Sequence, residues 1–173
     1  MATPRIQVQG TWWRITRPSA GPFVWTAEPA DGRWQRGEIV RAIYLGDDEP
    51  TVWAEWFRHT SEAGVPPARR LPRDIWRVEV DLDDVADLTA RGMLAARGID
   101  RLEPSRRQWP LTQAIGEGYF RDGARGVLAP SAARRGGRVL AVFRRGRGHP
   151  GLVAVPPAER HEKLPPLPRG LRT

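Results

Sequence analysis

The residues best suited to chemistry lie in one stretch, GRWQRGEIVRAIYLGDDEPTVWAEW, which covers residues 32–56. Arg33 precedes a β-branched run, Tyr44 lies inside that run, and Glu55 follows it on a predicted helix. Glu55 stands alone among apolar residues, whereas a solvated helix usually carries several carboxylates on its polar face. This isolated carboxylate is therefore the first candidate for a functional group.

The composition limits the chemistry that is available. The chain contains no cysteine, which excludes disulfides and thiolate metal sites. Its histidines, His59, His149 and His161, are far apart and show no ligand spacing, so we predict no metal site. The only lysine, Lys163, follows no glycine-rich phosphate loop, and GEGYFR at residues 116–121 departs from the dinucleotide-binding pattern at its last position. Catalysis would therefore depend on carboxylates, hydroxyls and arginines.

Length and charge indicate a single folded domain with an affinity for anions. The 173 residues include eight tryptophans and are 40% hydrophobic, which is enough for a core. The formal net charge of +8 favours nucleic acid, an acidic partner or a phosphate-bearing ligand. A codon bias toward arginine is the alternative, because the arginines are scattered and form no basic block. No apolar run suits a membrane span or signal sequence, so we expect a cytoplasmic protein without membrane contact.

The hydrophobic pattern mixes strands and helices without a regular βαβ alternation. Alternating or β-branched runs predict strands at residues 11–16, 38–45, 75–82, 126–129 and 138–143. Helices are predicted from the N-cap Asp48 to about residue 62, at residues 83–97 and at residues 109–120. The expected fold class is α+β, a single domain with a mixed β-sheet core flanked by helices.

Five features, in order along the chain, resemble the RES-domain family, which is named for an arginine, a glutamate and a serine. They are Arg14 in the first strand, Arg33 in the GRW turn, Tyr44 in the IYL strand, Glu55 after an alanine in the helix, and Ser131 in GVLAPSAAR. The family typically has GRWN where this chain has GRWQ, with Gln35 in the last position.

The resemblance implies a fold and a domain organisation. It covers roughly residues 11 to 143 and implies an ADP-ribosyltransferase-like fold with a split β-sheet. We expect an N-terminal extension at residues 1–10, a RES domain at residues 11–155 and a Pro-rich, flexible tail at residues 156–173.

The resemblance also implies the toxin of a bacterial toxin–antitoxin pair, which consumes NAD as substrate and needs no cofactor. The enzyme would cleave the nicotinamide–ribose bond with water or inorganic phosphate as acceptor, or transfer ADP-ribose to a protein. The implied partner is an Xre-like antitoxin in a hetero-oligomer, with DNA contacted only through that antitoxin.

Each residue has a physical role in such a reaction. A planar guanidinium pairs with two phosphate oxygens, which suits Arg14 and Arg33 to the pyrophosphate. Glu55 would stabilise the positive sugar that forms when nicotinamide leaves. Tyr44 offers a ring face and a hydroxyl, so the predicted catalytic residues are Glu55, Arg14 and Tyr44. Arg33, Ser131 and Trp34 are predicted to bind the substrate.

Several alternatives stay open at this point. Arg14 could be a structural ion-pair or cation–π residue, and Arg17 competes with it as the functional arginine of the first strand. Tyr44 could be a core residue, Glu55 could pair with Arg58 or Arg41, and Ser131 could only cap a turn. A basic module that binds nucleic acid without catalysis is the alternative from another functional class.

Overall fold

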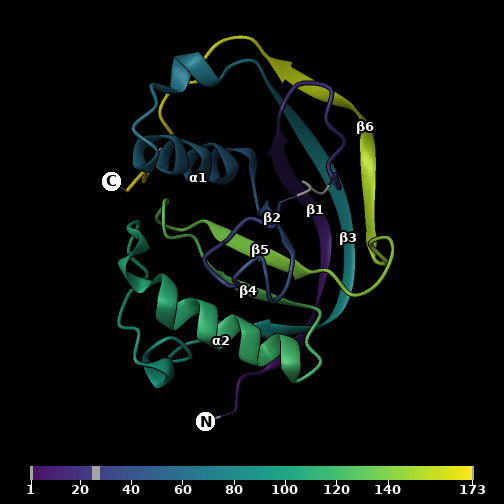
Figure 1. Cartoon of the computed structure of the whole chain (residues 1–173), viewed down its shortest axis with the longest axis vertical. Helices are drawn as coiled ribbons and strands as arrows, with labels where there is room; N and C mark the ends of the chain where they lie inside the picture. Colours follow the sequence, from purple (N-terminus) through teal and green to yellow (C-terminus); the bar gives the residue numbers. More distant parts are fainter. Residues whose placement is uncertain (1, 25–27, 173) are drawn as a thin grey trace.

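A long strand, β3 (Arg73–Asp87), organises the computed structural model, which describes residues 2–24 and 28–172 (Figure 1). Buried Val78, Val80 and Leu82 alternate along it with exposed residues, the pattern of a strand with one face on the core. It pairs with three strands, β1 (Arg5–Thr16), β4 (Gly126–Pro130) and β6 (Leu152–His161).

The six strands form one mixed sheet with the order β1-β2-β5-β4-β3-β6, in which β2 is Ala42–Gly46 and β5 is Arg138–Phe143. The pairing of β3 with β4 is parallel and the other pairings are antiparallel. Because β1 also pairs with β3, the pairings of five strands run in a ring, and β6 pairs with the first half of β3. Apolar side chains from these strands form one core cluster.

Two helices cover the sheet. Helix α1 (Glu49–Glu62) starts at Asp48, whose side chain accepts a hydrogen bond from the Thr51 amide, and its Trp53 and Phe57 pack near Ile75 of β3. Helix α2 (Trp109–Arg121) starts with a proline in its first turn, and its Tyr119 belongs to a second core cluster. In Figure 1 both helices lie on the same side of the curved β1–β3–β6 layer, with β2, β4 and β5 between them. Short 3₁₀ turns occupy Pro67–Arg70, Ala95–Arg97 and Arg106–Gln108.

The expected α+β class, with a mixed sheet flanked by helices, is confirmed, but the helix expected at residues 83–97 is wrong. Residues 83–87 continue β3 through an irregularity at Asp84, where φ is 53°. The register between β1 and β3 shifts at the same place. Only Ala95–Arg97 forms a short 3₁₀ turn. A bulge therefore lets the strand continue through a run whose acidic residues suggested a helix start.

Both ends of the chain are more regular than expected. Residues 5–10 belong to β1 and pair with β3, although the strand was expected to start at residue 11. Residues 156–161, expected in the flexible tail, belong to β6. The second strand starts at Ala42 instead of residue 38, because residues 37–39 form a turn. Long-range pairing therefore orders segments whose local composition is polar or Pro-rich.

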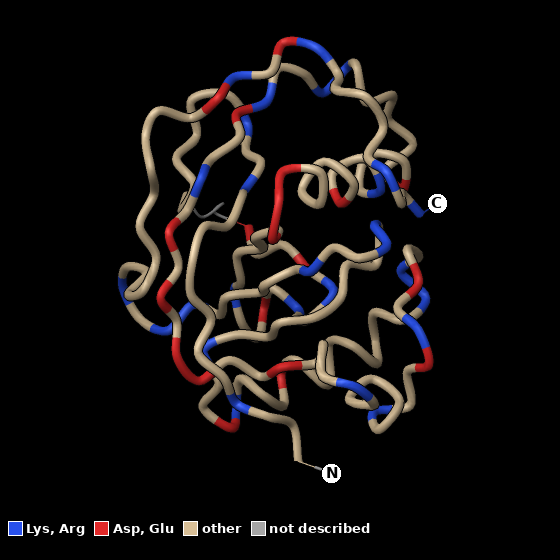
Figure 2. The backbone as a smooth tube through the Cα atoms, turned by 180° about the vertical axis from the view of Figure 1, so that it is seen from behind, with Lys and Arg blue, Asp and Glu red and all other residues tan. Residues whose placement is uncertain are grey.

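Charged residues are distributed over the whole chain. Figure 2 shows basic residues spread over many separate parts of the backbone, with acidic residues between them. Basic residues therefore do not gather on one element, as they do in many nucleic-acid-binding modules. No helix within the described residues is long and apolar enough to cross a bilayer.

Candidate active site

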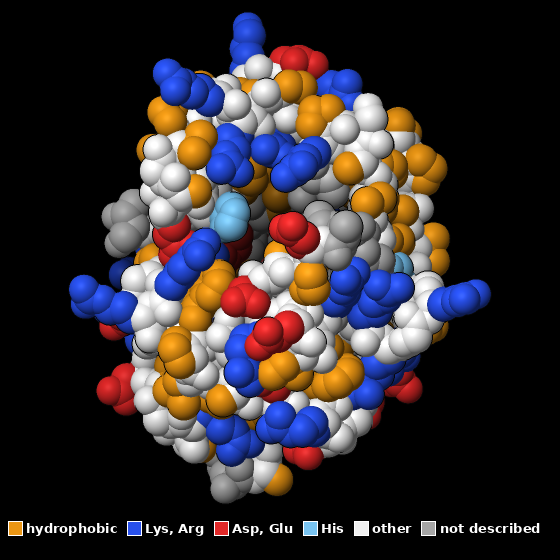
Figure 3. Space-filling view, in the orientation of Figure 1, with side chains coloured by type: hydrophobic (Ala, Val, Ile, Leu, Met, Phe, Trp, Pro, Cys, Tyr) orange, Lys and Arg blue, Asp and Glu red, His pale blue; other side chains and the backbone are white. Residues whose placement is uncertain are grey.

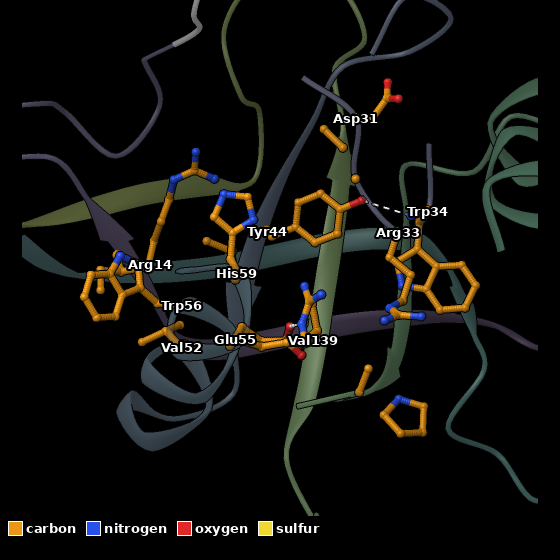
Figure 4. Close-up of a pocket in the computed structure, with 18 of the residues that line it drawn as sticks. Arg14, Asp31, Arg33, Trp34, Tyr44, Val52, Glu55, Trp56, His59 and Val139 are labelled. Carbon is orange, nitrogen blue, oxygen red and sulfur yellow. Dashed lines mark hydrogen bonds and ion pairs between the residues drawn. The ribbon is translucent and has the colours of Figure 1, made fainter. Parts of the chain in front are cut away.

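A cleft of about 300 Å³ lies between α1, β2 and the turn at residues 31–34. Figure 3 shows a hollow near the middle of this face, bordered by basic and acidic side chains. Five of the six predicted site residues line the cleft, namely Arg14, Arg33, Trp34, Tyr44 and Glu55. Figure 4 shows Arg14 and Arg33 on opposite sides of Glu55, with the ring of Tyr44 between them. Residues far apart in sequence therefore meet in one place.

Glu55 is held by a protein group on each carboxylate oxygen. Its Oε1 accepts a hydrogen bond from Ser131 Oγ at 2.7 Å, and its Oε2 accepts one from Arg58 Nε at 3.1 Å. The helix fixes the backbone of Glu55, while these two donors fix its side chain. The carboxylate is thus preorganised at the cleft wall, with about a quarter of its side chain exposed.

Ser131 lies behind Glu55 rather than at the surface of the cleft. It is only 1% exposed and does not line the cleft. Its hydroxyl donates to Glu55 and accepts hydrogen bonds from the backbone amides of Ala133 (3.2 Å) and Arg134 (3.0 Å). We predicted substrate contact for Ser131, whereas this geometry makes it a turn cap that positions the carboxylate.

Tyr44 fastens the GRW turn to β2. Its hydroxyl donates to Gln35 Oε1 at 2.6 Å and accepts from the Trp34 amide at 3.0 Å. A Cβ on Gly32 would lie 2.2 Å from that hydroxyl, so the turn requires glycine at this position. Burial raises the pKa of Tyr44 well above its ordinary value, which keeps the phenol neutral. Its hydroxyl is thus committed to the turn, and its ring is the part that faces the cleft.

Arg33 joins the cleft to the loop that precedes α2. Its Nη2 donates to the carbonyl oxygen of Glu103 at 2.7 Å, while its buried Nη1 has no hydrogen-bond partner within the described residues. Burial, and secondarily the nearby Arg58, lowers the pKa of Arg33. Trp34 borders the cleft, but its indole is 1% exposed and packs in the core cluster of Tyr119 and Phe143. It therefore anchors the turn.

Arg14 lines the cleft from β1 and has no ion-pair partner among the described residues. No acidic residue in the described part of the chain makes an ion pair with Arg14, and its buried Nε makes no hydrogen bond there. Burial lowers its pKa below the ordinary arginine value, to about 10. Arg17, the alternative arginine, directly follows β1, is exposed and does not line the cleft. The position of Arg14 suits an anionic ligand.

Two residues of the site were not predicted, Arg58 and His59. Arg58 contacts Glu55 and Glu62, and its Nη1 also donates to the Pro104 carbonyl at 3.1 Å. His59 lines the cleft, and partial burial together with Arg58 lowers its pKa. The pairing of Glu55 with Arg58, three residues further along, was one of the open alternatives and is confirmed, but the link from Arg58 to residue 104 depends on the fold.

The site thus combines a fixed carboxylate, the guanidinium groups of Arg14, Arg33 and Arg58, and an aromatic ring in one cleft. No set of three potential metal ligands lies in this cleft within the described residues, and the one candidate set lies elsewhere. The fold and cleft define a class: a single-domain α+β protein with a cleft lined by a fixed carboxylate and guanidinium groups, which suits an anionic ligand.

Comparison with known proteins identifies the family. The RES domain profile matches residues 11–166. The chain is 36% identical over 169 residues to the Probable NAD(+) phosphorylase Rv3189 of Mycobacterium tuberculosis (strain ATCC 25618 / H37Rv), which covers 96% of this chain and 77% of that protein. It also resembles a chain of the crystal structure of the M. tuberculosis MbcT–MbcA toxin–antitoxin complex, with a TM-score of 0.72, 25% identity, and coverage of 97% of this chain and 91% of that chain. This protein belongs to the RES-domain family.

Proposed function

We propose that this protein is an NAD-consuming toxin that cleaves the nicotinamide–ribose bond, with inorganic phosphate or water as the acceptor. One observation carries the proposal: Arg14, Arg33, Tyr44 and Glu55 line a single cleft, and Glu55 is fixed on both oxygens. The name of the M. tuberculosis relative, a probable NAD(+) phosphorylase, supports the substrate and favours phosphate as the acceptor.

The residues divide the work according to their chemistry. Departure of neutral nicotinamide leaves positive charge on the ribose, and the fixed carboxylate of Glu55 stabilises that charge without reorganising. Arg14 and Arg33 pair with the pyrophosphate, whose negative charge compensates their buried positive charges. The ring of Tyr44 offers a flat apolar surface for a base. No cofactor is needed for this step, because NAD is the substrate.

Product analysis tests the proposal. The purified protein is incubated with NAD in a phosphate-free buffer and in the same buffer with inorganic phosphate. We expect free nicotinamide in both cases, with ADP-ribose 1″-phosphate formed when phosphate is present and ADP-ribose when water is the acceptor. Label from NAD that ends on a protein in lysate would indicate ADP-ribosyl transfer instead. Intact NAD in every condition would contradict the proposal, and salt-sensitive binding to DNA or RNA would then favour the nucleic-acid module.

We propose an antitoxin as partner and the cytoplasm as the site of action, because NAD is consumed there. The toxin–antitoxin title of the similar structure supports an Xre-like partner in a hetero-oligomer, with DNA contacted only through it. Within the α+β class, we propose that the sheet is the split β-sheet of ADP-ribosyltransferases. Co-expression with the product of the neighbouring gene should abolish NAD loss, and unchanged turnover in a stable complex would contradict this partner.

A further inference from the structure

A cluster of three potential metal ligands, outside the cleft, joins helix α1 to strand β6. Glu49 is the first residue of α1, and Glu159 and His161 lie two residues apart on β6, so they share one face of the strand. One oxygen of each glutamate and a ring nitrogen of His161 all lie within 4.8 Å of one another. None of the three residues lines the catalytic cleft. The cluster is therefore a separate feature that the proposed reaction does not use.

The distances in the cluster are wider than hydrogen bonds. His161 Nε2 is 3.3 Å from Glu159 Oε1 and 3.6 Å from Glu49 Oε1, whereas an N–H···O bond usually spans about 2.7–3.2 Å. The Nε2 atom is buried and has no hydrogen-bond partner in the described part of the chain. At these distances the nitrogen forms ion pairs with the two carboxylates only when the imidazole is protonated, and a neutral imidazole has no hydrogen bond there within the described residues.

The same distances fit a shared metal ion. A tetrahedral ion with ligands at about 2.0–2.2 Å separates its ligand atoms by about 3.3–3.6 Å. The two measured nitrogen–oxygen separations fall in this interval. An imidazole nitrogen together with carboxylate oxygens suits a divalent transition metal rather than Ca²⁺ or Mg²⁺, which prefer oxygen ligands alone.

The charges around the cluster also favour a cation. The chain has 28 basic residues, yet neither Glu49 nor Glu159 makes an ion pair with arginine or lysine among the residues that the structure describes. Arg73, the strand neighbour of His161, has its guanidinium over the ring of Trp56 instead. The two carboxylates thus keep negative charge that a bound cation would neutralise.

Trp53, next to the cluster, contacts two of the proposed ligands, Glu49 and His161. Trp53, one turn after Glu49, donates from Nε1 to Glu49 Oε1 at 3.1 Å, and its ring lies edge-on to His161 at 5.3 Å. Such outer contacts hold metal ligands in place. We propose that Glu49, Glu159 and His161 form a binding site for a divalent transition-metal ion, open to water on the exposed side of Glu159, which fastens β6 to the start of α1.

Direct metal binding tests this site without reference to NAD turnover. The full chain is treated with a chelator, and Zn²⁺ is then titrated in competition with a chromophoric chelator. We expect one Zn²⁺ per chain and a higher thermal midpoint, because a ligand that binds only the folded state stabilises it. Co²⁺ in place of Zn²⁺ should give the intense visible absorption of a four- or five-coordinate site.

Variants connect the binding to these residues. Glu159→Gln changes a side chain that is 71% exposed, so it should fold and bind Zn²⁺ at least 10-fold more weakly, and His161→Ala should lose more. Glu162→Gln, the matched control, removes an exposed carboxylate outside the cluster and should bind as the wild type does. Absence of saturable binding, or equal binding by Glu159→Gln and Glu162→Gln, would overturn the site. These outcomes are independent of whether the protein consumes NAD.

Discussion

The charged groups on the two walls of the cleft have different surroundings. On the α1 wall, Glu55 has a hydrogen-bond donor on each oxygen, from Ser131 and Arg58. On the β1 wall, Arg14 projects from a strand into a buried position where no described carboxylate pairs with it. The negative group is therefore fixed before the substrate arrives, whereas the positive group is compensated only when an anion binds. The difference separates a group that acts on the reacting bond from one that holds the substrate.

Neutralising Glu55 should have the largest effect. Glu55→Gln keeps the size of the side chain and an oxygen for Ser131, but it removes the charge that stabilises the developing positive sugar. We expect kcat for NAD consumption to fall by about 10²–10⁴-fold, with only a small fall in the thermal midpoint from the lost ion pair with Arg58. Glu62→Gln is the control, because Glu62 also pairs with Arg58 but does not line the cleft. Full activity of Glu55→Gln would show that the carboxylate has no role in the reaction.

Removing the unpaired charge should separate activity from stability. Arg14→Met should raise KM for NAD about 10–100-fold, because a charge-assisted contact with the pyrophosphate is lost. It should also stabilise the folded protein at pH 7, by about 1–3 kcal/mol, since a buried and uncompensated charge disappears. Arg17→Met, an exposed position directly after β1, should change neither property. Loss of stability in Arg14→Met would show that Arg14 has a structural partner.

The pH dependence of that stability difference follows from the Arg14 pKa. Burial lowers this pKa to about 10, below the ordinary arginine value, so the unfolded chain holds the proton more tightly than the folded chain. The charge therefore costs stability at all pH values below about 10, and the cost decreases as pH rises from there toward the pKa of arginine in the unfolded chain. Denaturation of the wild type and of Arg14→Met at pH 7 and pH 11 should show that their free energies of unfolding differ less at the higher pH.

Local signals predicted the parts of the molecule that local interactions determine. Asp48 with a following proline marked the start of α1, and Pro110 marked the start of α2. The strand at residues 138–143 had the predicted bounds, because it is apolar and fully buried after its first residue. The family resemblance added Arg14 and connected it with Glu55, which the local pattern had already singled out as an isolated carboxylate.

Features that depend on long-range contacts were missed. Residues 5–10 and 156–161 read as polar or Pro-rich segments, and only their pairing with β3 makes them strands. Ser131 was identified, but the sequence contains no information on which side of Glu55 its hydroxyl lies. The cluster of Glu49, Glu159 and His161 joins residues from the two halves of the chain, so no ligand spacing could indicate it.

The smallest expected effect concerns the support of the fixed carboxylate. Ser131→Ala removes the donor to Glu55 Oε1 and the acceptor for two backbone amides, so it should destabilise the fold by about 1–2 kcal/mol. Because Arg58 still holds the other oxygen, kcat should fall only about 10-fold, with KM for NAD unchanged. Ser61→Ala, an exposed change on α1, serves as the matched control. A rise in KM with constant kcat would instead place the Ser131 hydroxyl on the substrate, and the two walls would then share the work of binding.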